Sequence, residues 1–262
     1  MEKGEEKYLQ VTHDETQYEA VYEEVSRREE QKDKEELDFF SHLIPDRPGL
    51  EVLDLGCAEG KLAILLAKKG HDVVAADISA NYLEQAKRAA KAQSVSIETI
   101  KCDIETDTTC FHGRKFDYIL FMDVIEHLRS PIRGLENIRE LLKEDGTLFI
   151  HTPNACSIPM FCHNLVNRKK VSNFLDPRTV RDLHLQLYDF STLTKLCNFV
   201  GLKVIRIIPT KATLPKITSS RIIARRFPAI CNTLLIECNK CQPIDIAEVV
   251  GSWVSSSSTK KE

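Results

Sequence analysis

The sequence predicts an α/β fold in which a mostly parallel sheet carries helices on both faces. Short, nearly continuous apolar runs alternate with stretches whose apolar residues recur at helical spacing. Such runs are typical of parallel strands that are buried on both faces. The first run leads through a glycine-containing turn into a helical stretch. The connections between the strands are expected to be right-handed crossovers.

Apolar spacing and capping residues predict the elements of the first half. Two amphipathic helices come first, one over residues 18–25 and one over residues 37–44 that ends before Pro45. Gly70 closes the next helix, and Ser79 caps the helix after it. Strands are expected at 51–55, 72–76 and 96–101, with helices at 61–69 and from Ser79 to about residue 92.

The second half repeats this alternation until prolines and asparagines interrupt it over residues 153–189, which we interpret as an insertion at the substrate side of the sheet. Pro131 marks the first turn of one predicted helix, and Gly201 marks the end of another. Asp145-Gly146 is predicted to form a turn between a helix and a strand. Strands are expected at 116–121, 147–151, 202–208 and 233–237, with helices at 131–143 and 191–199. The predicted domains are a helical extension or lid over 1–46, a main domain over 47–240 and a disordered tail over 241–262.

Composition and charge limit the classes of protein. Of 262 residues, 42% are hydrophobic and 29% are charged, as in ordinary globular proteins. No apolar run approaches the ~18–20 residues that span a bilayer, and no secretory signal is readable at Met1. Nine unpatterned cysteines fit a reducing compartment, so a cytoplasmic location is expected.

The distribution of charge bears on the partners. The net charge of −3 argues against a nucleic-acid partner, which would require a basic chain. Residues 1–36 carry 13 acids and 6 bases, whereas residues 190–236 carry eight Lys and Arg and no acid. The basic stretch is either the solvent face of ordinary elements or a means of attracting an anionic small-molecule acceptor.

The strongest motif is the loop from Asp54 to Lys61, which joins the first strand to its helix. Gly56 and Gly60 lie four residues apart, and glycine there permits a tight turn and close approach of a ligand. A dinucleotide-binding loop would carry a third glycine and would face a pyrophosphate, for which acids are unsuitable. Asp54 and Glu59 are acidic, which favours a ligand with a cationic ammonium or sulfonium group.

Two further acids follow the next strands of the predicted sheet. Asp77 stands 21 residues after Gly56, where a carboxylate can accept hydrogen bonds from both hydroxyls of a ribose. Asp103 and the amide of Ile104 follow the third strand and could bind the amino group and a ring nitrogen of adenine. Each acid also has a structural reading, as a helix N-terminal acid for Asp77 and as part of a surface turn for Asp103.

Together these residues resemble the class I S-adenosylmethionine-dependent methyltransferases. The match includes residues 54–60, 77, 102–103, 116–120, 126–127 and 141–148, within roughly residues 48–210. The resemblance implies a Rossmann-like sheet of seven strands with an antiparallel last strand. It implies that Asp54, Gly56 and Gly60 hold the methionine moiety, Asp77 the ribose and Asp103 the adenine, with Cys57, Ile78, Ile104 and Asp123 beside them. Ala58 replaces the family's usual glycine and is expected to narrow the pocket slightly.

Asp123, Glu126 and His127 are candidates for a metal site or for catalysis. If a helix starts at Asp123, the three side chains share one face, and two carboxylates and an imidazole can bind a divalent ion such as Mg²⁺. The segment is similar to the Glu-x-x-Glu-His segment of ubiquinone-biosynthesis and small-RNA methyltransferases, with the shorter Asp in first place. The alternatives are that His127 is a general base with Glu126, or that the segment only shapes the cofactor site.

His184 precedes the helix at 191–199 and is a further candidate base or ligand, or an ordinary loop histidine. The sequence thus predicts methyl transfer from S-adenosylmethionine to a small molecule, with oxygen favoured as the acceptor atom. The alternatives are a metal-assisted RNA 2′-O-methyltransferase and a non-catalytic protein that only binds the nucleoside. A nicotinamide-dependent oxidoreductase is a third and disfavoured class. The identity of the acceptor and the oligomeric state cannot be read from the sequence.

Overall fold

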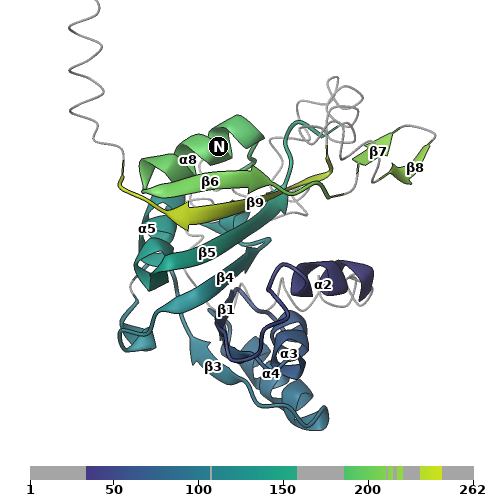
Figure 1. Cartoon of the computed structure of the whole chain (residues 1–262), viewed down its shortest axis with the longest axis vertical. Coiled ribbons are helices and arrows are strands. Elements are labelled where there is room, and N and C mark those ends of the chain that lie inside the picture. Colours follow the sequence, from purple (N-terminus) through teal and green to yellow (C-terminus); the bar gives the residue numbers. More distant parts are fainter. Residues whose placement is uncertain are drawn as a thin grey trace, which may run out of the picture. The chain divides into compact units, whose positions relative to one another are not determined.

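The computed structural model describes residues 34–106, 108–157, 186–210, 212–214, 217–220 and 231–243. The chain divides into two compact units, Met1–Asp103 and Ile104–Glu262 (Figure 1). Seven strands belong to one mostly parallel sheet, so the predicted α/β class is confirmed. The predicted helix over 18–25, most of the predicted insertion and nearly all of the predicted tail lie outside the described residues. Among the helices in the described ranges, none combines the length and apolar character that a membrane crossing requires.

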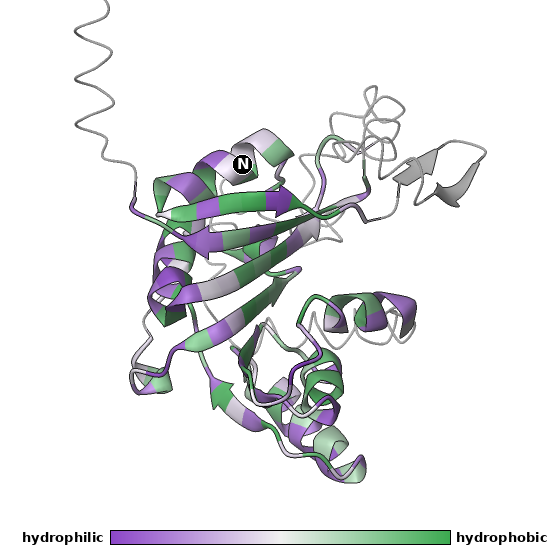
Figure 2. Cartoon of the chain, viewed as in Figure 1, coloured by the Kyte–Doolittle hydropathy of each residue, from purple (hydrophilic) through white to green (hydrophobic). Residues whose placement is uncertain are grey.

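The first unit contains three parallel strands in the order β3-β2-β1. Its strands are β1 (Glu51–Leu55), β2 (Asp72–Asp77) and β3 (Glu98–Lys101), and its helices are α2 (Lys34–Ser41), α3 (Lys61–Lys68) and α4 (Ala80–Ala92). Only the first residue of β1 and of β2 is not buried, which explains why both strands appear in the sequence as continuous apolar runs. Figure 2 shows hydrophobic and hydrophilic positions alternating along α3 and α4, as expected for helices that bury one face.

Local signals account for the helix boundaries of this unit. The Ser79 hydroxyl accepts a hydrogen bond from the Tyr82 amide at 3.3 Å, which caps α4 as predicted. Gly70, with φ +86°, follows α3 in the left-handed conformation expected after a helix end. Helix α2 ends at Ser41, earlier than predicted, where the Ser41 hydroxyl donates to the Asp38 carbonyl at 2.8 Å. Such side-chain bonds compete with continuation of a helix.

The second unit contains strands in the order β4-β5-β9-β6, beside a separate hairpin of β7 and β8. Its elements are β4 (Phe116–Met122), β5 (Leu142–Pro153), β6 (Leu202–Ile207), β7 (Ala212–Leu214), β8 (Ile217–Ser220), β9 (Thr233–Lys240), α5 (Pro131–Leu141), α8 (Phe190–Phe199) and the 3₁₀ turns η1 (Thr109–Phe111) and η2 (Ile125–His127). Strands β4 and β5 are parallel, and β9 is antiparallel to both β5 and β6. The antiparallel last strand is therefore confirmed.

Three details of the second unit differ from the sequence prediction. Helix α5 ends at Leu141, and β5 begins at Leu142, so the predicted turn at Asp145-Gly146 lies within the span of β5. The pairing of β4 with β5 shifts there, because Phe116 pairs with Leu142 whereas Tyr118 pairs with Thr147. The turn residues thus form an irregularity in the ladder. The hairpin of β7 and β8 was not predicted, since strands of three and four residues leave little periodicity.

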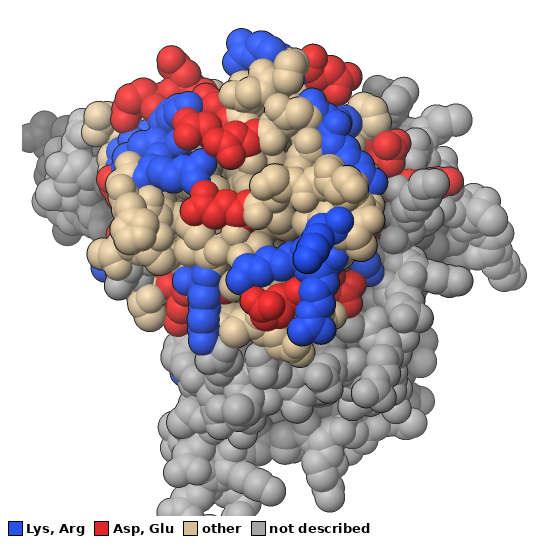
Figure 3. Space-filling model, turned by 90° about the horizontal axis from the view of Figure 1, so that it is seen from below, with Lys and Arg blue, Asp and Glu red and all other residues tan. Residues whose placement is uncertain are grey.

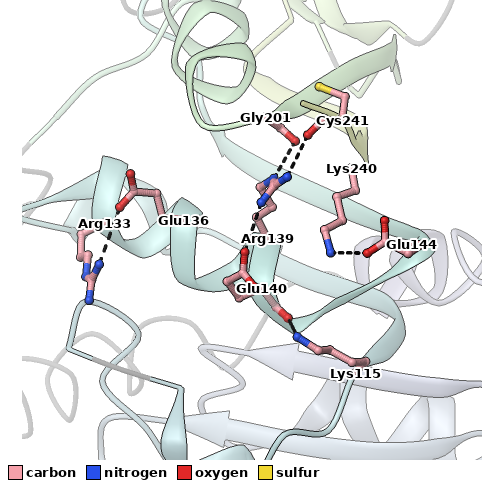
Figure 4. A network of polar contacts seen from close by, with 9 residues as sticks. All are labelled: Lys115, Arg133, Glu136, Arg139, Glu140, Glu144, Gly201, Lys240 and Cys241. Carbon is pink, nitrogen blue, oxygen red and sulfur yellow. Dashed lines mark hydrogen bonds and ion pairs between the residues drawn. The ribbon is translucent and has the colours of Figure 1, made fainter. Parts of the chain in front are cut away.

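Arg139 on α5 connects the helix to two turns distant in the sequence (Figure 4). Its guanidinium donates to the carbonyl of Gly201 at 3.3 Å and to the carbonyl of Cys241 at 3.1 Å. Its side chain is 18% exposed, whereas the Arg133 side chain, paired with Glu136 on the same helix, is 55% exposed. Arg139 therefore supplies buried donors to carbonyl groups, whereas Arg133 contributes a solvated surface pair.

The substitution Arg139→Ala is expected to lower the free energy of unfolding by about 1–3 kcal/mol. The Cys241 carbonyl loses its bond to the guanidinium, and the Gly201 carbonyl keeps only the bond from the Cys241 amide. Arg133→Ala is the matched control, with an expected change of at most about 0.5 kcal/mol for an exposed ion pair. Urea unfolding followed by circular dichroism measures both values. Equal effects of the two substitutions would contradict a special role for Arg139.

Candidate functional site

The loop between β1 and α3 is held by backbone hydrogen bonds and by its glycines. The amides of Gly56 and Cys57 donate to the carbonyl of Ala76 at 2.8 and 3.0 Å, which ties the loop to the end of β2. Gly60 has φ +70°, and a Cβ there would lie 2.7 Å from the Cβ of Ala86 on α4. Glycine is therefore required at this position both by backbone conformation and by the close approach of α4.

Ala58 adopts the left-handed conformation, with φ +45°, in the middle of this loop. The side chain is exposed. The conformation disfavours residues with a Cβ by about 1–2 kcal/mol, so the departure from the family's glycine adds backbone strain. The expected narrowing of a pocket by Ala58 stays a prediction.

The Asp54 carboxylate is buried behind this loop, with a relative exposure of 3%. Its Oδ2 accepts a hydrogen bond from the Ala63 amide in the first turn of α3 at 3.1 Å. Burial raises the pKa of Asp54 to about 7, the Ala63 amide opposes this rise, and the Asp77 carboxylate adds to it. Asp54 therefore holds the start of α3 and carries a proton equilibrium near neutral pH.

Asp77 fixes the other side of the loop with both of its carboxylate oxygens. Oδ2 accepts from the Ala58 amide and Oδ1 from the Ser79 amide, each at 2.9 Å. Burial raises the pKa of Asp77, and these two amides and that of Ile78 oppose the rise. Since each carboxylate oxygen can accept more than one hydrogen bond, the acid retains capacity for ligand hydroxyls while it holds the loop.

The remaining residues predicted to bind the cofactor belong to both units of the chain. In the first unit, Cys57 is buried, and Ile78 and Asp103 are half-buried. Burial raises the pKa of the Cys57 thiol, which therefore stays protonated. In the second unit, Ile104 is buried and its carbonyl accepts from the Asn137 side chain at 2.6 Å. The structure brings Asp54, Cys57 and Asp77 to the same loop, which matches the grouping predicted from the sequence.

No helix starts at Asp123, so the condition for a shared face of Asp123, Glu126 and His127 is not met. Asp123 has φ +54°, outside the helical region, and only the short turn η2 follows it. The Asp123 amide donates to the carbonyl of His151 at 2.9 Å, and its Oδ1 lies 2.9 Å from Nδ1 of His151. Asp123 is thus held against the end of β5, and the common face of the three side chains does not form.

Glu126 lies in the η2 turn and is 1% exposed. Its Oε2 accepts from the Thr152 hydroxyl on β5 at 2.9 Å. Burial raises the pKa of Glu126 to about 7, and the neighbouring Asp123 carboxylate adds to the rise. His127, the next residue, is half-buried. The ends of β4 and β5 therefore hold a compact group of acidic and imidazole side chains.

The predicted metal ligands do not fit a metal ion. No group of three or more His, Cys, Asp and Glu side chains in the described ranges is arranged to hold one. The Asp123 carboxylate contacts His151, and the Glu126 carboxylate contacts Thr152. Because the helix that would have aligned Asp123, Glu126 and His127 is absent, we derive no catalytic step through a metal. His184 lies outside the described residues.

Three polar residues belong to segments that the resemblance to the family predicts at the mouth for the acceptor. His151 and Asn154 follow the fifth predicted strand, and Tyr188 comes four residues after His184. His151, Asn154 and Tyr188 are 2%, 1% and 3% exposed, respectively. His151 and Asn154 follow the apolar core of β5, and the Thr-Pro-Asn turn at residues 152–154 is the sequence signal of this segment. Tyr188 ends the His-x-x-x-Tyr segment that starts at His184 in the sequence, but its hydrogen bond to Gln186 could be found only in the structure.

Comparison with known proteins identifies the family. A family model described as a methyltransferase domain matches residues 25–207. The chain is 34% identical over 122 residues to the ubiquinone biosynthesis O-methyltransferase of Actinobacillus pleuropneumoniae serotype 5b, covering 45% of this chain and 52% of the relative. It is 33% identical over 159 residues to the enzyme of the same name from Coxiella burnetii (strain Dugway 5J108-111), covering 61% and 66%. The match therefore spans between about half and two thirds of these two relatives.

The fold is also shared with solved structures. Magnesium protoporphyrin IX methyltransferase from Synechocystis PCC 6803, solved with bound SAH, superposes with a TM-score of 0.55 at 18% identity, covering 79% of this chain and 82% of that one. This identity supports the fold alone, whereas the family model covers more than half of the chain. The chain therefore belongs to the methyltransferase-domain family, as a class I S-adenosylmethionine-dependent methyltransferase.

Proposed function

We propose that this methyltransferase acts on an oxygen atom of a small-molecule acceptor. The observation that carries the proposal is the buried group at the ends of β4 and β5, where Asp123 contacts His151 and Glu126 contacts Thr152. A hydroxyl acceptor loses a proton when it is methylated, and carboxylates and imidazoles can take it. The relatives named O-methyltransferases support the same assignment. A cytoplasmic location is part of this proposal, and an anionic acceptor stays a prediction.

The residues around the first loop suit a cationic nucleoside. Asp54 and Asp77 place two buried carboxyl groups beside a glycine-rich turn, and a sulfonium or ammonium group would favour their ionised forms. We assign the methionine part to Asp54, Gly56, Cys57 and Gly60, the ribose to Asp77 and Ile78, the adenine to Asp103 and Ile104, and a contact near the sulfonium to Asp123.

The reaction then follows from the chemistry of the two substrates. When bound, S-adenosylmethionine supplies an electrophilic methyl group on a positively charged sulfur. The acceptor oxygen forms a bond to the methyl carbon, the carbon–sulfur bond breaks, and its electron pair stays on sulfur. Side chains of this protein orient the acceptor, exclude water and take the hydroxyl proton. We assign the proton acceptor to the group of Glu126, His127 and His184.

The alternatives make different predictions. An RNA 2′-O-methyltransferase needs a basic surface, but in the face that Figure 3 shows, acidic and basic side chains are intermingled. Incubation with S-adenosylmethionine labelled in its methyl group, against a panel of phenols, alcohols and RNA, separates the possibilities. Label in the small molecules supports the proposal, label in RNA supports the first alternative, and tight binding without any transfer supports a protein that only binds the nucleoside.

Replacing Asp77 with alanine is expected to weaken S-adenosylmethionine binding by about 1–3 kcal/mol, because a buried charged hydrogen-bond acceptor is lost. Calorimetric titration of the folded variant measures the change, with Asp145→Ala as a control at an exposed carboxylate. NAD serves as the control ligand and is expected not to bind. An unchanged affinity in the Asp77 variant would place the ribose elsewhere.

Chelation of divalent metals is expected to leave methyl transfer unchanged. The physical reason is that the Asp123 and Glu126 carboxylates already contact His151 and Thr152. The measurement compares initial rates after dialysis against EDTA with rates after Mg²⁺ is added back. Loss of activity on dialysis, restored by Mg²⁺, would reinstate a metal site.

A further inference from the structure

Residues Gln186–Tyr188, which we call the strap, form hydrogen bonds with the backbone of the η2 turn. The Gln186 amide donates to the carbonyl of Glu126 at 3.1 Å. The Gln186 side-chain Nε2 donates to the carbonyl of Leu128 at 3.5 Å. One glutamine therefore bonds to the chain on both sides of His127, although it lies about 60 residues later in the sequence.

Tyr188 holds this glutamine in place. Its hydroxyl donates to Oε1 of Gln186 at 2.6 Å, and its ring is buried. Burial raises the pKa of Tyr188 well above its ordinary value, and the Glu126 carboxylate adds to the rise. The hydroxyl therefore keeps its proton and acts as a donor to Gln186, which excludes it as the proton acceptor of the reaction.

The other end of the strap is attached to the segment after β5. Asn154 pairs with Tyr188 in an isolated bridge, and the Ala155 amide donates to the Tyr188 carbonyl at 2.9 Å. The Asn154 side chain donates to the Cys231 carbonyl at 2.8 Å and accepts from the Cys156 amide at 2.9 Å. The strap is thus fixed to the segment that follows β5, and Asn154 in turn ties that segment to Cys231, two residues before β9.

The η2 turn needs such external support. It consists of three residues, and its own backbone bonds are those from His127 to Val124 at 2.9 Å and from Leu128 to Ile125 at 3.3 Å. Short 3₁₀ turns have poorer hydrogen-bond geometry than α-helices. A group that must transfer a proton has to be held in position closely, since a misplacement of about 1 Å can reduce the rate about 100-fold.

We propose that Gln186 and Tyr188 are positioning residues that hold the Glu126–His127 turn at the acceptor end of the methyl-transfer site. The proposal rests on the proposed function for its catalytic consequence. Its structural part, that the strap restrains the turn, can be tested without knowing the acceptor. The two residues act through Glu126 and His127 and need no contact with either substrate.

The test uses Gln186→Ala, Tyr188→Phe and the double variant, with Tyr118→Phe as the matched control. Tyr118 lies on β4, stacked on Phe149. Hydrogen exchange read by mass spectrometry is expected to be about tenfold faster at residues 126–128 in the strap variants. Tyr118→Phe is expected to leave that exchange unchanged. The double variant should exchange no faster than Gln186→Ala, because Tyr188 acts through Gln186.

The catalytic readout uses the phenol or alcohol that the wild type methylates fastest. The strap variants are expected to lose about tenfold or more in kcat, while KM and Kd for S-adenosylmethionine stay within about twofold. Gln186→Glu keeps the oxygen that accepts from Tyr188 and loses the bond to Leu128, so an intermediate kcat is expected. If the Gln186→Ala variant does not fold, kcat and hydrogen exchange of Gln186→Glu and Tyr188→Phe are compared with those of the wild type instead.

Wild-type exchange rates at residues 126–128 in all folded strap variants would overturn the proposal. A loss of cofactor affinity equal to the loss of kcat would also overturn it, since that pattern indicates general damage to the fold. If the wild type binds S-adenosylmethionine but methylates no hydroxyl compound, the proposed function fails. The exchange comparison then still decides whether the strap restrains the turn.

Discussion

Replacing Gly60 with alanine is expected to lower the free energy of unfolding by about 2–4 kcal/mol, as the sum of left-handed backbone strain and overpacking. The new Cβ would lie 2.7 Å from the Cβ of Ala86, at a residue whose φ is +70°. Either the loop or α4 must move, and the loop is the segment to which we assign the methionine part of the cofactor. The variant is therefore also expected to bind S-adenosylmethionine weakly.

Gly113 offers a control that separates the two contributions. It has φ +78°, but a Cβ there would meet no atom within 4 Å. Gly113→Ala should therefore show backbone strain alone, about 1 kcal/mol, and should leave cofactor binding unchanged. Urea unfolding and calorimetric titration measure the two quantities. Equal destabilisation by both substitutions would mean that α4 moves away from the new Cβ with no loss in the free energy of unfolding.

Binding of S-adenosylmethionine at slightly acidic pH is expected to release protons. Burial raises the pKa of Asp54 from 3.8 to about 7, so at about pH 6.5 most Asp54 carboxyls in the free protein are protonated. A cationic ligand favours the ionised form, and the bound protein must lose that proton. Calorimetry in two buffers with different ionisation enthalpies measures the release, and Asp54→Asn is expected to reduce it.

Cofactor affinity is expected to rise with pH as Asp54 ionises. The same carboxyl is expected to make the free protein less stable as pH rises. A raised folded-state pKa means that its favourable contribution is complete below the unfolded-state pKa and is lost as pH rises through about 7. Glu126, whose pKa burial raises to about 7, adds to this trend. The free protein should therefore be more stable near pH 6 than near pH 8, while affinity for the cofactor rises over that interval.

Two variants and one control make this test specific. Asp54→Asn and Glu126→Gln should each flatten the dependence of stability on pH, whereas Asp145→Asn, at an exposed carboxyl, should not. Proton uptake on cofactor binding, or a free protein that becomes more stable as pH rises from about 6 to about 8, would contradict the assignment of buried, protonated carboxyls to these positions.

The sequence predicts a structural feature well when that feature depends on residues close together in the chain. The strand at 51–55 and the cap at Ser79 are found where expected, and the strand predicted at 72–76 extends one residue further, to Asp77. Apolar runs and capping residues act over a few positions, so the sequence shows them directly. The loop at Gly60 and the acids Asp54 and Asp77 also come together as predicted. In a parallel sheet, residues that end neighbouring strands lie at one edge, so their proximity follows from the order of elements.

The sequence alone therefore determined the fold class, the order of most elements and the acidic character of the loop after the first strand. Only the tertiary structure decided the conformation of Asp123, the pairing of Glu126 with Thr152 and the attachment of Gln186 to the η2 turn. These features depend on hydrogen bonds between residues about 26 to 60 positions apart, which leave no periodicity in the sequence. Because buried polar groups need hydrogen-bond partners, these contacts fix a conformation that local sequence signals do not specify.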